Sequence, residues 1–252
     1  MEGNAKTGAI KKTANKNNGA EVDVSTFLRD RPNIDARKDD APICWERTFN
    51  GYRVIDLGSD NIEEALQLIQ REFFRSEPMC KSTKLHTDIT SVESYLHILV
   101  TKMADLKSVC AIREGTGELV GVAVASLNLK GDQQRTETRV RPHQGQALFR
   151  VMNLKSCLFK EANIYENLHI DKYLRIHAVC VEPLHQGRGV GTALIRSCVT
   201  RTREFLIPAC IGGFSSGASQ TIGNVLILGE RILFSFLFQK SPRYYYEISR
   251  RY

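Results

Sequence analysis

The stretch that decides the fold is HAVCVEPLHQGRGVGTAL, which runs from His177 to Leu194. It begins with apolar residues typical of a buried strand, breaks at Glu182-Pro183, and continues through three glycines into an apolar helix pattern. Glycine lacks a Cβ, so the backbone of such a turn can adopt a positive φ and approach a ligand closely. The first N–H groups of the following helix have no intrahelical partner and lie at the positive end of the helix dipole. The turn can therefore hold a phosphate, or it can serve packing alone.

Two common phosphate-binding loops do not fit this turn. The Walker pattern G-x-x-x-x-G-K-S/T does not occur in the sequence. A Rossmann G-x-G-x-x-G turn opens the first strand–helix unit of its domain, whereas this turn begins late in the chain, at Gly187. Arg188 adds positive charge within the turn itself.

The composition indicates one soluble globular domain. The chain has 252 residues, of which 42% are hydrophobic and 25% are charged, enough for a large core. Residues 1–40 are rich in Lys, Asn, Asp and Ala and poor in aromatics, so we expect this segment to be disordered or loosely attached and the domain to span 41–252. No apolar run approaches the ~20 residues of a membrane span, and the N-terminus lacks a signal-peptide pattern. We expect a cytoplasmic protein without membrane contact.

Charge and cysteine usage narrow the partners. The net charge of +7 is typical of a solvated basic surface or of attraction for an anion such as a polyphosphate cofactor. No nucleic-acid-binding motif accompanies it, so no nucleic acid is expected. The 7 cysteines are scattered without C-x-x-C spacing, and the 6 histidines show no ligand pattern. We therefore expect reduced cysteines and no metal site.

Periodicity predicts the order β-α-α-β-β-α-β-α before a less regular C-terminal region. A strand is expected at 52–56, followed by a helix that Asp60 caps, with Glu63 reaching back, and that ends before Pro78. A second capping box at Thr90–Glu93 predicts a helix to Met103. The remaining expected elements are a hairpin at 108–129 around its 115–117 turn, an exposed loop at 131–146, a helix at 147–165, a strand at 173–181 and a helix at 191–206.

The stretch VCVEPLHQGRGVGTAL resembles the signature of the GNAT superfamily of N-acetyltransferases, a hydrophobic strand followed by Q/R-x-x-G-x-G/A. In that family the amides of the turn hold the pyrophosphate of acetyl-CoA. The strand before the turn separates from its neighbour and bonds the pantetheine arm and the thioester. The resemblance implies an α/β (α+β) fold with a mixed central sheet flanked by helices, and acetyl-CoA as co-substrate. It implies cofactor contacts, through the backbone in the strand, for Val179, Val181, Gln186, Gly187, Arg188, Gly189, Val190, Gly191 and Thr192.

Two strings, DKYLRIHAVCVEPLHQGRGVG and REFFRSEPMCKS, are similar to insect arylalkylamine N-acetyltransferases, which acetylate dopamine, serotonin, octopamine, tyramine and related amines. In these enzymes F-F-x-x-E-P at a helix end supplies a glutamate as general base, and Glu77 occupies that position here. A primary amine is a cation at neutral pH, so a base must take its proton before the nitrogen attacks the thioester. The alternative for Glu77 is a solvated residue at the helix end, ahead of Pro78.

The string FSSGASQ supplies a second set of candidates. The family places two serines four residues apart at the start of a helix near the thioester, and Ser215 and Ser219 match that spacing whereas Ser216 does not. The resemblance implies that they return a proton to the leaving thiolate or contact the substrate; the alternative is that they cap the last helix. Cys180, between two valines, is expected to be buried and inert, so we expect direct transfer without an acyl-enzyme. Glu182 is the rival base, expected to be held outward.

The resemblance covers residues from Tyr52 to Asn224. Beyond them, NVLILGERILFSFLF has Leu-Gly-Glu where the family has Leu-Gly-Phe, and the sequence that follows Gly229 suffices for one strand and a tail. Two functions remain open: an acetyl-CoA-dependent amine acetyltransferase, or an acyl-CoA-binding module of the same fold without the chemistry. The acceptor can be an arylalkylamine or an aliphatic polyamine, a small molecule in either case, and the family expectation is a monomer.

Overall fold

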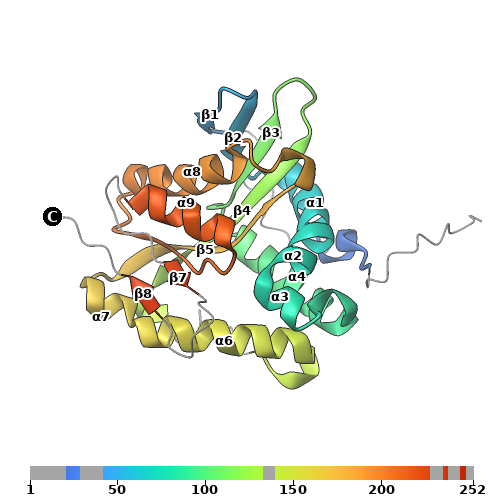
Figure 1. Ribbon diagram of the computed structural model, residues 1–252, viewed down its shortest axis with the longest axis vertical. Helices are drawn as coiled ribbons and strands as arrows, with labels where there is room; N and C mark the ends of the chain where they lie inside the picture. Colours follow the sequence, from blue (N-terminus) through green and yellow to red (C-terminus); the bar gives the residue numbers. More distant parts are fainter. Residues whose placement is uncertain (1–20, 29–41, 133–139, 228–234, 238–244, 248–252) are drawn as a thin grey trace, which may run out of the picture.

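A six-stranded mixed sheet organises the molecule (Figure 1). The computed structural model describes residues 21–28, 42–132, 140–227, 235–237 and 245–247. The strands follow one another in sequence order across the sheet, and all neighbours are antiparallel except the last pair, which is parallel. They are β1 (Cys44–Arg47), β2 (Tyr52–Asp56), β3 (Val109–Arg113), β4 (Leu119–Leu129), β5 (Lys172–Val181) and β6 (Cys210–Gly212). The predicted mixed sheet flanked by helices is confirmed.

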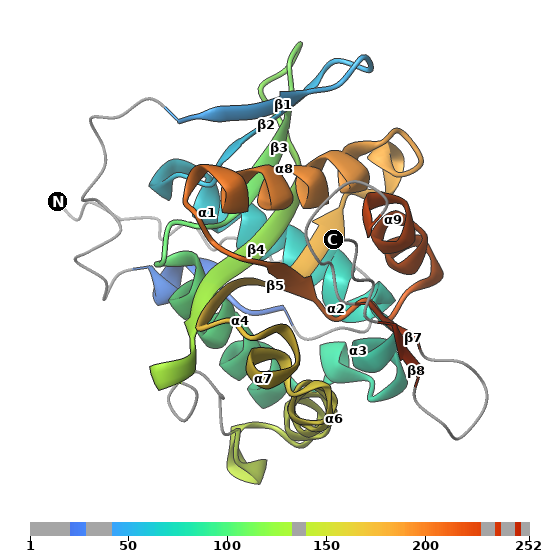
Figure 2. The ribbon, with the colours of Figure 1, turned by 90° about the vertical axis from the view of Figure 1, so that its left-hand side faces the viewer.

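Helices cover both faces of the sheet (Figures 1 and 2). One face carries α1 (Ser59–Leu68), which continues through a π-helix (Ile69–Phe73) into α2 (Phe74–Ser76), and then α3 (Pro78–Ser82) and α4 (Ile89–Met103). The opposite face carries α8 (Val190–Glu204), followed by α9 (Gly217–Ile227). The long α6 (Gln146–Ala162) and the short α7 (Ile164–Leu168) lie across one end of the sheet. None of the helices in the described part of the chain combines the length and apolar character needed to cross a bilayer.

The predicted strand 52–56, the 108–129 hairpin and the helix after the glycine turn are confirmed, but two predicted helix caps are wrong. The residue that caps α1 is Gly58, so Asp60 lies inside the first turn of that helix. The cap of α4 is Asp88, whose carboxylate accepts from the Ser91 N–H at 3.2 Å. The same carboxylate accepts from the N–H of Ala147 at 3.2 Å, so this cap also fastens the start of α6. The sequence alone does not reveal that second, long-range partner.

The two ends of the chain depart from expectation where the structure describes them. Within residues 21–28, a 3-10 helix spans Val24–Phe27, and Val24 is buried in the core beneath α1 and α4. The expectation of loose attachment is therefore corrected for these residues. The rest of 1–40 and the Leu-Gly-Glu at 228–230 lie outside the described residues. Instead of one C-terminal strand there are two, β7 (Ser235–Leu237) and β8 (Tyr245–Glu247), which form a small separate antiparallel sheet.

A bulge in β5 changes which face its side chains occupy. Val124 and Ala125 of β4 are adjacent, yet their partners on β5 are Ala178 and Ile176, so His177 is an extra residue without a partner on β4. Before the bulge, Ile176 packs into the core under α8. After it, Ala178 packs into the opposite core under α1 and α4. Without the bulge, the two residues would share one face of the strand.

Candidate active site

The glycine turn between β5 and α8 has the geometry of an anion-binding site. Gly187 and Gly189 have φ values of +71° and +84°, a region that favours glycine, and a Cβ on either would meet no atom within 4 Å. Gly189 is the N-cap of α8 and supplies no side-chain cap, so the first N–H groups of the helix keep open space in front of them. Asn50, on the β1–β2 turn, donates to the Arg188 carbonyl at 3.0 Å and braces the loop. An anion fits at this helix start.

Two residues of the predicted turn are used differently from what the sequence suggested. Gly191 lies inside α8, and a Cβ there would come within 3.3 Å of Ile222 on α9. Its role is close helix packing, not a positive φ. The Gln186 side chain donates to the Val181 carbonyl at 2.9 Å, so it ties the turn back to the end of β5.

A cavity of about 800 Å³ begins at this turn and follows the edge of β5. It is lined by Val179 and Val181 and by most of the predicted turn residues, namely Gln186, Gly187, Gly189, Gly191 and Thr192. The parallel partner β6 pairs with β5 only from Leu174 to Ile176, so the strands part at Ile176, the first residue of β5 that lines this cavity. The separation of strands that the resemblance implied is therefore present.

Glu77 lies on the wall of the same cavity and is buried, with only 9% of its surface exposed. The alternative that Glu77 is a solvated residue at a helix end is wrong. Pro78 is the first residue of α3, and Glu77 caps that helix. One carboxylate oxygen accepts from the Cys80 N–H at 2.7 Å. The other accepts a hydrogen bond from the Ser215 hydroxyl, which comes from the loop between β6 and α9.

The two serines predicted as a pair have separate partners. Ser215 bonds Glu77, which is 138 positions away in the sequence. Ser219 lies in the first turn of α9, where its N–H donates to the Ser216 hydroxyl at 3.2 Å and the two hydroxyl oxygens lie 2.8 Å apart. Ser216 therefore caps α9, the structural role that the sequence left open for this segment. All three serines line the 800 Å³ cavity.

Cys180 and Glu182 are poorly suited to take part in the chemistry. Burial, with the nearby carboxylates Glu72 and Glu182, raises the pKa of the Cys180 thiol to about 12, so it stays protonated and a weak nucleophile at neutral pH. The Glu182 carboxylate forms an ion pair with Arg71. Glu182 lines neither of the two cavities of this site.

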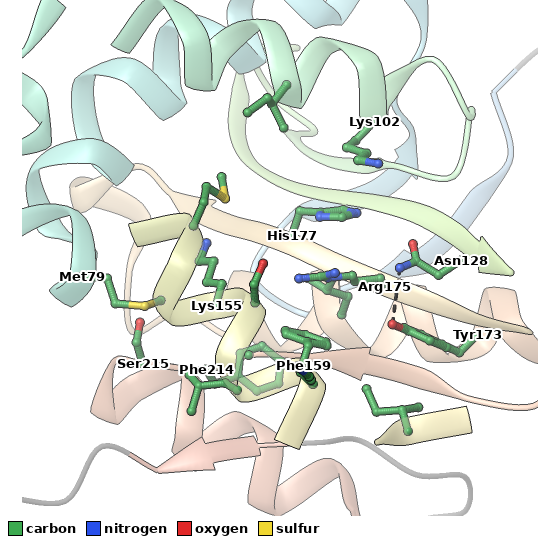
Figure 3. Close-up of a pocket in the computed structure, with 18 of the residues that line it drawn as sticks. Met79, Lys102, Asn128, Lys155, Phe159, Tyr173, Arg175, His177, Phe214 and Ser215 are labelled. Carbon is green, nitrogen blue, oxygen red and sulfur yellow. Dashed lines mark hydrogen bonds between the residues drawn. The ribbon is translucent and has the colours of Figure 1, made fainter. Parts of the chain in front are cut away.

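A second cavity, of about 590 Å³, joins the first at seven shared residues and runs between α4, α6 and the first half of β5 (Figure 3). Its lining combines aliphatic side chains with five aromatic ones, namely Tyr95, Phe159, Tyr165, Tyr173 and Phe214. The shared residues include Lys155, whose ammonium donates to the Tyr95 hydroxyl at 2.7 Å. Burial raises the pKa of Tyr95 to about 12, so its hydroxyl stays neutral.

Sequence reasoning missed Lys155, although a signal was present. In the expected helix at 147–165, the buried residues Val151, Leu158 and Ala162 recur at helical spacing, and Lys155 occupies the same stripe. A lysine on the buried stripe of an amphipathic helix indicates a cavity or a partner behind it. Arg175 and His177 also line the second cavity, and the sequence did not reveal this because the bulge interrupts the alternation that predicts which face of a strand each side chain occupies.

The comparisons with known proteins agree with this geometry. The acetyltransferase (GNAT) family matches residues 62–210. No curated protein matches significantly. Among solved structures, the protein described as arylalkylamine N-acetyltransferase 7 of the yellow fever mosquito Aedes aegypti superposes with a TM-score of 0.69 at 24% identity, covering 81% of this chain and 85% of its own. A Drosophila melanogaster polyamine N-acetyltransferase that forms N-acetylagmatine gives 0.59 at 17% identity, covering 74% and 84%.

The family match spans more than half of the chain and ends at the first residue of β6, and it includes both the Glu77 segment and the complete glycine turn. The co-substrate of this family is acetyl-CoA, and the open glycine turn fits its pyrophosphate. The chain belongs to the acetyltransferase (GNAT) family.

Proposed function

We propose that the protein transfers the acetyl group of acetyl-CoA directly to a primary amine. The observation that carries the proposal is the buried Glu77 carboxylate, bonded to Ser215, on the wall of the cavity that begins at the glycine turn. A base and a polar relay thus lie along the same cavity as an anion-binding loop. An acyl-CoA-binding module without chemistry does not require either group.

Acetyl-CoA is bound by the residues of the glycine turn and by the open edge of β5. The amides from Gly187 to Thr192 receive the pyrophosphate at the start of α8, and Arg188 adds positive charge. The backbone of Val179 and Val181 faces the pantetheine arm where β6 has left β5. Gln186 holds the turn against β5 and so positions these amides.

The amine enters as an ammonium ion and loses one proton to a base before its nitrogen bonds to the carbonyl carbon of acetyl-CoA. The carbon–sulfur bond then breaks, the nitrogen loses a second proton, the leaving thiolate takes up one proton, and the other is released to solvent. Glu77 accepts the proton of the amine, either directly or through the Ser215 hydroxyl, whose own proton already points to the carboxylate. Because the Cys180 thiol stays protonated, it does not compete with the amine for the acetyl group. Ser219, held by Ser216, remains the candidate for proton return.

The aromatic lining of the second cavity favours an arylalkylamine as the acceptor. One of the similar structures is described as an arylalkylamine acetyltransferase and another as a polyamine acetyltransferase. A polyamine carries a second ammonium group, and the lysines and arginine of this cavity repel it.

A thiol-release assay with acetyl-CoA and a panel of primary amines tests the proposal. Release of CoA that depends on the amine, at a rate above the hydrolysis of acetyl-CoA alone, is the expected result. Calorimetry with CoA accompanies the assay. Tight CoA binding without thiol release from any amine would make the protein a binding module and would refute the proposal.

A further inference from the structure

The glycine turn is a short exposed segment between two buried ends. The residues from Gln186 to Gly189 are exposed, whereas His185 before them and Val190 after them are buried. Two of the four exposed residues are glycines, which lose more conformational freedom on ordering than any other residue. A ligand that had to order this segment would bind more weakly, so contacts that order the segment beforehand strengthen binding.

The hairpin of β1 and β2 contacts this turn at two points. The Asn50 side chain, in the turn of the hairpin, donates to the Arg188 carbonyl at 3.0 Å. The Tyr52 hydroxyl oxygen lies 2.9 Å from Nδ1 of His185, and the two rings meet edge to face with their centroids 5.6 Å apart. The two contacts therefore fall on either side of Gly187, whose φ is +71°.

The hairpin is itself held in place by the central sheet. Tyr52 is 2% exposed and pairs with Arg113 of β3. The N–H of Thr48 donates to the Tyr52 carbonyl at 2.8 Å, which closes the hairpin, and the N–H of Glu114 donates to the Gly51 carbonyl at 2.9 Å. Side chains on so firmly bonded a backbone can hold the position of a segment that they contact.

A third contact joins the same hairpin to the helix after the turn. The Glu46 carboxylate accepts from the Arg196 guanidinium at 2.6 Å, and Figures 1 and 2 show β1 beside α8. Half of the Arg196 side chain is exposed, so this ion pair contributes little to stability. It shows that the hairpin follows the chain before, within and after the turn, while the hydrogen bonds of Asn50 and Tyr52 carry the inference.

We infer that Asn50 and Tyr52 are positioning residues of the acetyl-CoA site, which hold the glycine turn in the conformation whose amides receive the pyrophosphate. This rests on the proposed binding of acetyl-CoA at that turn. Both residues precede 62–210, the part of the chain that the family matches, and neither lines either cavity. They act through Arg188 and His185, so they should set the affinity for CoA and leave the transfer step unchanged.

Calorimetry with CoA measures the effect in two variants that each remove one hydrogen bond. Tyr52→Phe removes only the hydroxyl, and Asn50→Ala removes the amide of an exposed residue. We expect each variant to raise the Kd for CoA by roughly 3- to 10-fold, the size of one net hydrogen bond. An unchanged Kd in either folded variant would overturn the role of that residue. Asn50→Ala keeps the test decisive should loss of its partner at the buried His185 unfold Tyr52→Phe.

The matched control is Asn167→Ala, which removes another asparagine side chain that donates to a backbone carbonyl. Its acceptor is Ala162, at 2.8 Å, at the junction of α6 and α7 and away from the hairpin (Figure 1). The Kd of this variant for CoA should equal that of the wild type. A loss as large as that of Asn50→Ala would contradict a specific effect on the turn.

S-acetylpantetheine, which lacks the nucleotide and its pyrophosphate, shows where the loss arises. Its kcat/KM, or its competition with CoA if it is not turned over, should be the same in the wild type and in both variants. Equal losses for S-acetylpantetheine and acetyl-CoA would reveal a general loosening of the site and would overturn the inference.

Kinetics separate this inference from the proposed function. With acetyl-CoA as substrate, both variants should raise its KM and leave kcat nearly unchanged, and a fall in kcat at unchanged KM would overturn the positioning role. A wild-type protein that binds CoA but releases no thiol with any amine refutes the acetyltransferase, whereas weaker CoA binding in the two variants still upholds the inference. A wild-type protein that does not bind CoA would overturn both.

Discussion

Replacing Glu77 with glutamine should remove the proton acceptor of the site and leave its hydrogen-bonding framework in place. Glu77 caps α3 by accepting from the Cys80 N–H at 2.7 Å, and its other oxygen accepts from Ser215. The oxygen of a glutamine side chain can keep the first bond. Its NH₂ group can donate to the Ser215 oxygen, which reverses the second bond without losing it. The free energy of unfolding should therefore fall by no more than about 1 kcal/mol, the typical value of a helix cap.

The catalytic effect should be much larger than the effect on stability. General-base catalysis contributes ~10²–10⁴ in rate, so kcat should fall by that factor. This is about 3–5 kcal/mol of activation free energy at 1.36 kcal/mol per factor of ten. Acetyl-CoA binding should barely change, because the glycine turn lies on β5 and α8 whereas Glu77 lies between α2 and α3. A role in amine binding alone would instead raise KM with little change in kcat.

Steady-state kinetics at saturating acetyl-CoA, from roughly pH 6 to 9, measures this effect, and urea unfolding of the same variant measures stability. The acid side of the pH–rate profile should flatten in Glu77→Gln. The matched control is Glu182→Gln, the same chemical change at a carboxylate that pairs with Arg71 outside both cavities. A near-wild-type kcat in Glu77→Gln together with a large loss in Glu182→Gln would refute the reasoning and move the base to Glu182.

Three further predictions follow from single residues. Gly189→Glu should abolish CoA binding while the protein stays folded. The control is Gly189→Ala, which carries the same backbone strain of about 1–2 kcal/mol at φ +84° but adds no charge. If calorimetry gave the two variants equal affinities for CoA, the phosphate site would be contradicted. Cys180→Ala should keep most of kcat and lose about 1 kcal/mol of stability for its buried sulfur, and a loss of kcat beyond tenfold would indicate an acyl-enzyme. Burial and then its cationic neighbours lower the pKa of His177 well below the ordinary value of 6.5. Below pH 6.5 this histidine therefore binds a proton in the unfolded chain but stays neutral in the folded one. Stability should thus fall as the pH drops through that value, and urea unfolding of His177→Gln should show a smaller fall.

Local signals were enough to predict the strand, the glycine turn and the helix at one end of the candidate site. The strand before Glu182, the positive-φ glycines Gly187 and Gly189 and the apolar stripe of α8 lie within one short segment, and their conformations follow from residue type. The hairpin around Gly117, which has φ +74°, was predictable for the same reason. Where helix caps were predicted wrongly, the helix begins earlier than the capping residue that the sequence suggested: α1 starts at Ser59 after Gly58, and Asp88 caps α4.

The acceptor end could not be predicted, because its contacts are long-range. The partner of Glu77 is Ser215, and no local pattern connects the cap of α3 with the loop before α9. The Lys155–Tyr95 bond likewise joins α6 to α4. The resemblance to arylalkylamine N-acetyltransferases points to Glu77 as the base, but it does not predict that this residue is buried or that it caps α3. Both follow from Pro78, which begins a helix and does not end one.

The bulge at His177 explains how one strand can form walls of two cavities with different chemistry. With strict alternation, Arg175 and Val179 would share a face of β5, and the guanidinium group would lie along the cavity that Val179 lines. The extra residue instead sends Arg175 toward α6 and Val179 toward α8. Ile176 and His177 line both cavities, so the change of face coincides with the place where they join. The bulge thereby lets β5 line the cavity of the glycine turn with one face and the second cavity with the other, while the two cavities stay joined at the bulge itself.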